Sequence, residues 1–312
     1  MQLAPAKSAR RAAWLDSPER GSLRLLRLMV FVSMRLGRRI SRGALYAIAA
    51  YFFLFAPKAR VAARRYLGLA LGRRPTAGDR FRHLLYFAST IHDRVFLLND
   101  REHLFEISID GAATMRAQLH SGRGAVLIGA HMGSFEVIGA LARREPGLRA
   151  VMAMYEENAH KVKRIFSAIN PAATPEIVAL GRIDAMLQIA ERLAAGCFVG
   201  ILGDRTLGNE PVQAATLLGE RAYLPTGPMR TAAILGSPVI FMAALYRGGN
   251  RYHVVFSPIA DFAGVRGAAR APAVAAALAR YAALLDACCR ADPYNWFNFF
   301  DFWATRADRA EQ

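Results

Sequence analysis

The chain alternates short apolar runs with stretches of helical periodicity from residue 124 onward. Runs of four or five apolar residues, bounded by Gly, Pro or charged residues, predict buried strands. They lie at 125–128, 150–154, 177–180, 198–202, 238–242 and 253–256. Segments with a helical pattern stand between or after these runs, at 184–195, 226–235 and 268–283. Strand and helix in repetition predict an α/β fold, with a central mixed sheet flanked by helices.

The N-terminal part has a different pattern. Arginines at 24, 27 and 35 are interleaved with Leu, Met, Val and Phe, which is typical of a basic amphipathic helix at a membrane surface. The most apolar stretch, 43–56, has 14 residues, fewer than the roughly 20 that cross a bilayer as a helix. We therefore expect an anchor that lies in the membrane interface.

A stretch rich in Gly, Pro and Arg at 72–78 is the best candidate for a boundary, and apolar residues at helical spacing over 79–98 predict a helix after it. The predicted division is a basic, amphipathic, membrane-associating segment at 1–75 and a larger domain at 76–312.

Composition limits the class of protein. Apolar residues make up 54% of the chain and charged residues 21%, which excludes wholesale disorder. Residues 1–82 contain 18 Lys or Arg against three acids, so they carry +15 of the net charge of +17. A basic end fits nucleic acid, an anionic membrane or an acidic protein. The interleaved Leu and Phe favour the membrane, although heavy Arg usage can also reflect genome composition.

The cysteines favour a reducing, cytoplasmic setting. Cys197, Cys288 and Cys289 give neither a disulfide framework nor the spacing of zinc ligands. The His-Glu-x-x-His motif is absent as well, so we expect no metal and no cofactor. No compact apolar run with a small-residue cleavage site opens the chain, which argues against a secretory signal.

Two predicted strands end in polar residues, where the working groups of open α/β sheets gather. His131 and Glu136 follow the first, and Asp204 and Arg205 follow the fourth. Five residues on a continuous helix would place His131 and Glu136 about 140° apart. They can meet if His131 lies in the turn before the helix and Glu136 in its first turn. Gly133 then supplies the flexible link and Ser134 the N-cap.

This arrangement predicts a general base. A carboxylate bonded to one imidazole nitrogen fixes the tautomer, so the other nitrogen can take a proton from an acceptor. Backbone N–H groups around Gly133 and Ser134 would stabilise the oxyanion. The alternative for His131 is a purely structural histidine. No Gly-x-Ser-x-Gly elbow occurs, so a directly acting base, suited to transfer from a thioester, is preferred to a serine nucleophile.

The segment from His131 to Glu136 resembles the His-x4-Asp/Glu motif of the lipid A biosynthesis lauroyl/myristoyl acyltransferase family, part of the lysophospholipid-type acyltransferases. The similarity extends over most of the chain: the basic, apolar N-terminus, Gly203-Asp204-Arg205, the Leu-Pro-Thr-Gly-Pro segment at 224–228 and an aromatic C-terminus. The resemblance implies a glycerolipid-acyltransferase-like sheet, with His131 as general base and Glu136 as its partner. It further implies an acyl-carrier-protein thioester as donor, and action at the cytoplasmic face of the bacterial inner membrane, peripheral or single-pass.

The resemblance also suggests substrate-binding residues. Asp204 and Arg205 match a polar strand end that binds the acceptor or shapes the site, and a structural ion pair is the alternative. Arg164 would contact the phosphate-bearing arm of the donor, unless it is simply solvated. The segment 295–303 (NWFNFFDFW) is more aromatic than the ending of lipid A enzymes. It resembles a branch linked to other acylated lipids, including those made beside aryl-polyene-type pathways, or it is ordinary core or a membrane-interface belt.

The leading hypothesis is an acyltransferase that moves a fatty acyl group to a hydroxyl or amine of a (glyco)lipid. Its acyl chain would lie in an apolar groove between sheet and helices, and the acidic carrier would dock on the basic surface. One alternative is acyl-CoA-dependent transfer to a lysophospholipid or glycolipid. Another is a non-catalytic, lipid-binding membrane protein. Binding to nucleic acid is argued by charge alone and is the least favoured.

Overall fold

A seven-stranded mixed sheet forms the centre of the protein, in the order β1-β9-β8-β2-β5-β3-β4. The computed structural model describes residues 23–182, 184–206 and 210–303. The neighbours β8, β2, β5, β3 and β4 run parallel, whereas β9 is antiparallel to β8 and carries β1 parallel to itself. The strands are β1 (Glu106–Asp110), β2 (Ala125–Gly129), β3 (Ala150–Tyr155), β4 (Ile177–Leu180), β5 (Phe198–Leu202), β8 (Pro238–Tyr246) and β9 (Arg251–Asp261).

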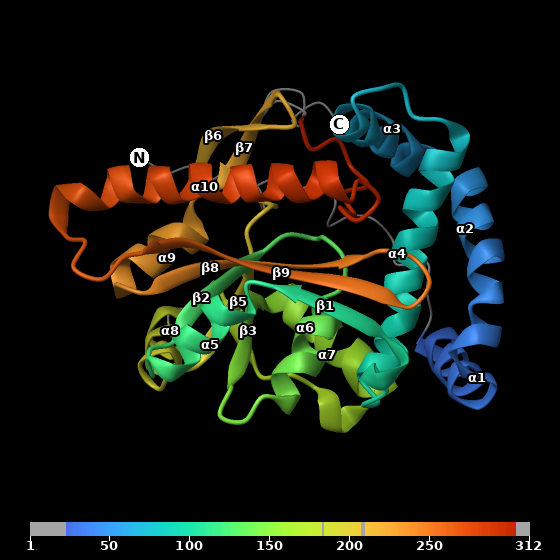
Figure 1. The fold of residues 1–312 in the computed structure, drawn as a ribbon, viewed down its shortest axis with the longest axis horizontal. Helices are drawn as coiled ribbons and strands as arrows, with labels where there is room; N and C mark the ends of the chain where they lie inside the picture. Colours follow the sequence, from blue (N-terminus) through green and yellow to red (C-terminus); the bar gives the residue numbers. More distant parts are fainter. Residues whose placement is uncertain (1–22, 183, 207–209, 304–312) are drawn as a thin grey trace, which may run out of the picture.

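Helices cover both faces of this sheet, and α10 crosses one face while α5, α6 and α7 lie on the other (Figure 1). Helices α1 to α4 stand together at the end of the sheet where β8 turns into β9. The helices are α1 (Leu23–Ser41), α2 (Gly43–Phe55), α3 (Pro57–Leu71), α4 (Ala77–Leu97), α5 (Ala112–His120), α6 (Phe135–Arg144), α7 (Glu156–Ile169), α8 (Ala185–Ala194), α9 (Gly227–Leu235) and α10 (Arg270–Ala291). A separate antiparallel hairpin consists of β6 (Val212–Leu217) and β7 (Glu220–Pro225). Short 3-10 turns occupy 102–104, 171–173 and 267–269.

Side-chain alternation along the central strands divides the core into two layers. In β2, Val126 and Ile128 pack into a large cluster with α8, α9 and α10, whereas Ala125 and Leu127 face α5 and α6. All five residues of β2 are buried, because a parallel strand covered on both faces must be apolar throughout. The apolar runs of the sequence therefore mark the middle of the sheet.

The predicted strands, helices and mixed sheet are confirmed, but β8, β9 and α10 extend four, five and eight residues beyond their predicted C-terminal ends. Three strands were not predicted. The edge strand β1 is mostly exposed and alternates polar with apolar residues, so it forms no apolar run. The hairpin β6–β7 is built largely from small and polar residues outside the main sheet. An edge or isolated strand has only one covered face, and its signal in the sequence is correspondingly weak.

The N-terminal helices pack on the rest of the protein. Tyr66 and Leu67 of α3 are buried in the same cluster as the central strands. Of the stretch at 72–78, residues 72–76 form the turn between α3 and α4, and the last two residues open α4, which begins with a capping box of Thr76 and Asp79. The division at residue 75 into a membrane-associating segment and a catalytic domain stays a prediction.

A buried ion pair fastens α1 to α4 and to the sheet. The Arg38 guanidinium donates two hydrogen bonds of 2.8 Å to the Asp93 carboxylate. Asp93 is fully buried and also accepts a hydrogen bond of 2.9 Å from the Tyr252 hydroxyl of β9. Arg38 bonds the Gly249 carbonyl in the β8–β9 turn as well. Three distant parts of the chain thus meet at one carboxylate.

Among the described residues, one helical stretch, Gly267–Ala291, is long and apolar enough to cross a membrane, and 44% of its most apolar window is buried inside the protein. Helices α2 and α3 pass the same test as a pair, with a bend of 97° between them.

We expect Arg38→Ala to lower the free energy of unfolding by about 3–5 kcal/mol, because it leaves the Asp93 charge buried without its partner. Urea denaturation followed by circular dichroism measures this loss. Arg39→Ala removes the same side chain from the exposed neighbouring position, and it should change the stability by less than about 1 kcal/mol. Equal losses in the two variants would show that the pair contributes nothing specific.

Candidate active site

The register of β2 and β5 determines where the polar strand ends meet. These parallel neighbours pair Gly129 with Leu202, and the Gly203 N–H continues the ladder by donating to the Gly129 carbonyl at 2.9 Å. His131 and Asp204 each lie two residues beyond that last pair. Two side chains at equivalent positions past adjacent parallel strands emerge side by side at one edge of the sheet. The sheet itself therefore brings the imidazole and the carboxylate together.

Asp204 is fully buried and holds His131 at two points. The imidazole Nδ1 lies 2.8 Å from Oδ1 of Asp204, and the backbone N–H of His131 donates to Oδ2 at 3.0 Å. The indole N–H of Trp296 donates to the same Oδ2 at 2.9 Å. An ionised carboxylate only accepts hydrogen bonds, so Nδ1 carries the proton and Nε2 is left as an acceptor. This is the tautomer that a general base requires.

Burial keeps the imidazole neutral. It is the largest effect on the pKa of His131 and lowers this pKa below its usual 6.5. The negative charge of Asp204 raises the pKa and the positive charge of Arg205 lowers it, so Asp204 offsets only part of the effect of burial. For Asp204, burial alone would raise the pKa, but His131, Arg205 and Trp296 together hold the pKa of this carboxyl well below its usual range. The carboxylate stays ionised and the imidazole stays unprotonated near neutral pH.

Glu136 lies in the first turn of α6, as predicted, but it forms an ion pair and a hydrogen bond with residues other than His131. Its Oε1 is 2.6 Å from Nε of Arg94 on α4, and its Oε2 accepts a hydrogen bond of 2.9 Å from the Ser134 hydroxyl. The predicted hydrogen bond from Glu136 to His131 is therefore made by Asp204 instead. Ser134 occupies the predicted N-cap position, yet its hydroxyl serves Glu136 and caps no backbone N–H.

The turn at Gly133 requires glycine. Its φ is +62°, and a Cβ at this position would lie 1.8 Å from the Ala244 carbonyl oxygen of β8. The N–H of Gly133 donates to the Asn295 carbonyl at 3.0 Å, and the N–H of Ser134 donates to the Ala244 carbonyl at 2.9 Å. The expectation that these two N–H groups form the oxyanion site is thus wrong for this structure, because both are engaged within the protein.

Arg205 lies beside the His131–Asp204 pair, whereas Arg164 does not. The Arg205 guanidinium donates to the Asn298 side chain at 2.9 Å and to the Phe297 carbonyl at 3.0 Å, and it lies 5.3 Å from the centre of the Phe300 ring. It lines the same cavity as His131. Arg164 is exposed on α7 and lies outside the lining of that cavity. The cation that α7 contributes to the lining is Lys161.

A cavity of about 980 Å³ opens between the sheet and helices α5, α6 and α7. His131, Glu136, Arg94 and Arg205 supply polar groups to its wall. The rest of the lining is largely apolar and includes Met115, Leu119, Leu127, Phe135, Ile138, Leu148, Met152, Met154, Val162, Phe166, Met242 and Phe256. An apolar cavity with a few convergent polar groups is the usual form of a site for an apolar ligand that carries one reactive end.

Two partners in the site were not predicted from the sequence. Arg94 pairs with Glu136 and Trp296 bonds Asp204, and each comes from a segment far from its partner in the chain. Local spacing contains no signal for such pairs. Chemically, the site holds a neutral imidazole with a free Nε2, a buried carboxylate that orients it, and the N-terminus of α6 on the same cavity wall, where negative charge is favoured.

Asp204→Asn should lower the pKa of His131 further, because it removes the negative charge that favours the imidazolium. Proton NMR titration of the imidazole measures this shift, and the His131 signal is assigned by its loss in His131→Gln. In the unaltered protein the pKa should lie below 6.5. An unchanged or higher pKa in Asp204→Asn would show that this carboxylate does not act on His131.

Comparison with known proteins supports the acyltransferase resemblance. The family model described as bacterial lipid A biosynthesis acyltransferase matches residues 15–305. No curated protein matches the chain. The family match spans both polar strand ends, the cavity and the aromatic C-terminal segment. The chain therefore belongs to the bacterial lipid A biosynthesis acyltransferase family, and it is an acyltransferase of lipid biosynthesis.

Proposed function

We propose that the protein transfers a fatty acyl group from an acyl-carrier-protein thioester to a hydroxyl or amine of a (glyco)lipid at the cytoplasmic face of the inner membrane. The observation that carries the proposal is the His131–Asp204 pair at the polar end of the apolar cavity. The imidazole is positioned to act on a group that enters this cavity. The long apolar remainder suits a fatty acyl chain.

The chemical steps follow from that pair. Nε2 of His131 takes the proton of the acceptor hydroxyl or amine as its oxygen or nitrogen attacks the thioester carbonyl carbon. The carbonyl electrons move to oxygen, and this negative charge is favoured by Arg205 and by the N-terminus of α6. When the intermediate collapses, the C–S bond breaks and the carrier thiolate takes the proton from His131. The imidazole returns to its starting state.

Glu136 is the second catalytic residue of the proposal. Its carboxylate is 7% exposed, lines the cavity with His131, and is held by Arg94 and Ser134. In the proposed mechanism Asp204 orients the base, and Glu136 accepts a hydrogen bond from a second O–H or N–H of the acceptor molecule and so aligns the attacking group with Nε2. The His–Glu pair thus acts on the same substrate molecule without a direct hydrogen bond between its members.

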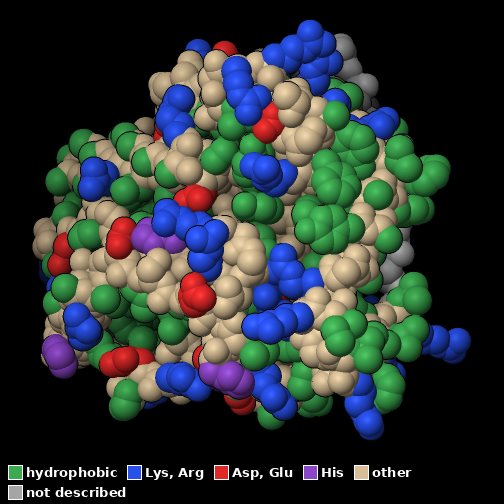
Figure 2. Space-filling view, turned by 45° about the vertical axis from the view of Figure 1, so that its right-hand side comes forward, with side chains coloured by type: hydrophobic (Ala, Val, Ile, Leu, Met, Phe, Trp, Pro, Cys, Tyr) green, Lys and Arg blue, Asp and Glu red, His purple; other side chains and the backbone are tan. Residues whose placement is uncertain are grey.

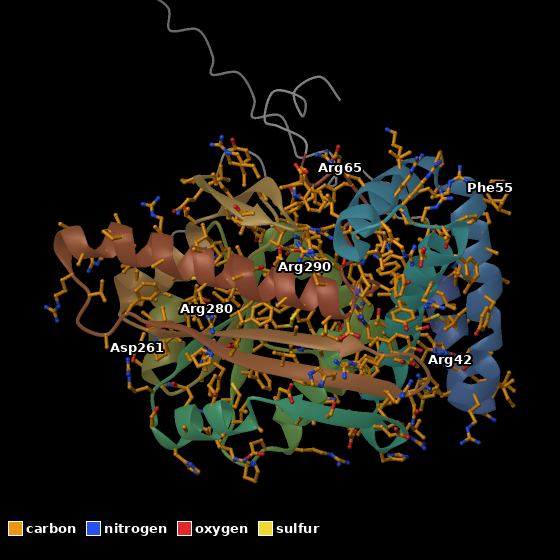
Figure 3. All side chains as sticks on the ribbon, turned by 45° about the horizontal axis from the view of Figure 1, so that its top comes forward. Arg42, Phe55, Arg65, Asp261, Arg280 and Arg290 are labelled. Atoms are coloured by element: carbon orange, nitrogen blue, oxygen red, sulfur yellow. The ribbon has the colours of Figure 1, made fainter. Side chains whose placement is uncertain are left out.

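The outer faces of α1 and α2 support association with a membrane. Large apolar side chains are exposed here among the described residues: Leu25, Leu28, Phe31, Leu36, Ile40, Tyr46, Ile48, Tyr51, Phe52, Leu54 and Phe55. Figure 2 shows hydrophobic side chains gathered on this side of the molecule beside Lys and Arg, and Phe55 points outward from the end of α2 (Figure 3). Apolar surface bordered by basic residues is what an anionic membrane binds. Residues 1–22 of the predicted membrane segment lie outside the described residues.

His131→Ala should lower the rate of acyl transfer about 10²–10⁴-fold, the usual contribution of a general base. Glu136→Ala should also lower the rate, because the acceptor loses its alignment. The assay follows labelled acyl groups from acyl-carrier-protein into a total membrane lipid extract. His103→Ala and Glu191→Ala, at exposed positions outside the cavity, serve as matched controls and should transfer like the wild type.

The outcomes of this assay separate the alternatives. Equal rates of turnover with acyl-CoA and with acyl-carrier-protein would favour the alternative of acyl-CoA-dependent transfer. Acyl transfer that persists in both the His131→Ala and the Glu136→Ala variants would refute the proposed mechanism. A wild type that binds lipid but transfers nothing would support a lipid-binding protein. If the donor is an acidic carrier protein, it should also bind this protein more tightly at low salt than at high salt.

Phe31→Glu combined with Phe55→Glu should reduce binding to vesicles of anionic phospholipid by about ten-fold or more, since two large apolar contacts are lost and two negative charges are added. Co-sedimentation with the vesicles measures the bound fraction. Ile234→Glu is the matched control because Ile234 is 53% exposed on α9, outside the patch. If only the control loses binding, or if neither protein does, the membrane-binding surface lies elsewhere on the protein.

A further inference from the structure

The C-terminal segment 295–298 closes over the turn that carries His131. The Phe297 N–H donates to the His131 carbonyl at 2.8 Å, and the Asn295 carbonyl accepts from the Gly133 N–H at 3.0 Å. Met132 and Trp296 form an antiparallel bridge between these two bonds. The backbone of this segment therefore holds the catalytic turn as a neighbouring strand would.

The side chain of Trp296 adds a further contact between segment 295–298 and the site. Its indole is fully buried, and its ring packs against Tyr66, Phe302 and Trp303 at centroid distances of 5.2, 4.7 and 5.9 Å. Its carbonyl oxygen lies 2.9 Å from Nε2 of His83, which is also buried. Three aromatic contacts thus restrain the ring, and its single N–H points at Oδ2 of Asp204. A rigid donor on a buried carboxylate restricts the directions in which that carboxylate can accept.

We propose that Trp296 is a positioning residue for acyl transfer, which acts through Asp204 to hold the His131 imidazole in the orientation that the reaction needs. The proposal rests on the proposed role of His131 as general base. Asp204 accepts three hydrogen bonds, two from His131 and one from Trp296. Without the indole donor, the carboxylate can rotate and take the imidazole out of line with the substrate.

Trp303 provides a matched control within the same aromatic cluster. It is 8% exposed, contacts Trp296 edge to face, and its indole N–H has no hydrogen-bond partner within the described part of the chain. Replacing the indole N–H of Trp303 removes the same kind of group from the same aromatic cluster and leaves the hydrogen bonds of Asp204 unchanged. A purely structural role for the cluster predicts similar effects at both tryptophans, whereas the proposal predicts an effect at Trp296 alone.

The first experiment replaces each tryptophan by Phe and, in a second pair of variants, by β-(3-benzothienyl)alanine, which keeps the bicyclic shape and substitutes sulfur for N–H. The second pair preserves the packing if the Phe variants fail to fold. At position 296, kcat should fall about ten-fold with little change in KM. At position 303 neither constant should move. Equal values at both positions would overturn the proposal.

The second measurement needs no substrate. Loss of the indole donor concentrates negative charge on Asp204, so the pKa of His131 should rise in the Trp296 variants and stay unchanged in the Trp303 variants. The charged groups that act on this imidazole are Asp204 and Arg205. NMR titration gives the values. A wild type without transfer activity would refute the proposed function, and the titration would still decide whether Trp296 acts on the pair.

The third measurement asks whether Trp296 works through Asp204. In an Asp204→Asn background, Trp296→Phe should reduce kcat by less than about two-fold, because residues that act as a unit are not additive. A reduction as large as that in the unaltered protein would show an independent role in folding or packing and would overturn the proposal.

Discussion

The pairing of β2 with β5 is the constraint on which the active site depends. Parallel strands in register deliver the residues that follow them to the same edge of the sheet, and here those residues are a histidine and an aspartate. A slip of one residue would exchange the two faces of β5, which pack Val199 and Ile201 into one cluster and Phe198 into another, so the packing of the core opposes a shift in register. The distance between imidazole and carboxylate is therefore maintained by the core of the protein and not by loops alone.

A buried carboxylate is costly unless its charge is compensated. Asp204 meets that requirement with three hydrogen bonds from His131 and Trp296 and with the positive charge of Arg205. A similar arrangement recurs at Asp93, which pairs with Arg38 and accepts a hydrogen bond from Tyr252. The first cluster orients the His131 imidazole, and the second fastens α1 to the sheet. In both, the acid comes from one element and its donors from segments distant in sequence, so the compact fold and the charge arrangement depend on each other.

Much of the fold was predictable because central parallel strands must be apolar on both faces and are therefore visible as runs. The exposed strand β1 and the hairpin β6–β7 lack that feature. For the site, strand ends identified His131, Glu136, Asp204 and Arg205 as candidates. The partner of His131 was assigned wrongly, since nearness in sequence favoured Glu136, while the order of strands in the sheet placed Asp204 next to it. Strand order arises from the whole chain and has no local signature.

The packing of segment 295–298 against the His131 turn also has a consequence for the order in which the site forms as the chain is synthesised. The ribosome makes His131 and Asp204 well before Asn295 and Trp296, which are separated from Asp204 by about ninety positions. Until these late residues emerge, the N–H of Gly133 and one hydrogen-bonding position of Asp204 have no partner, and Asp204 alone holds the His131 imidazole. A nascent or prematurely ended chain would thus carry this turn without the strand-like segment that packs against it. The candidate site is therefore completed only after synthesis has passed the aromatic segment.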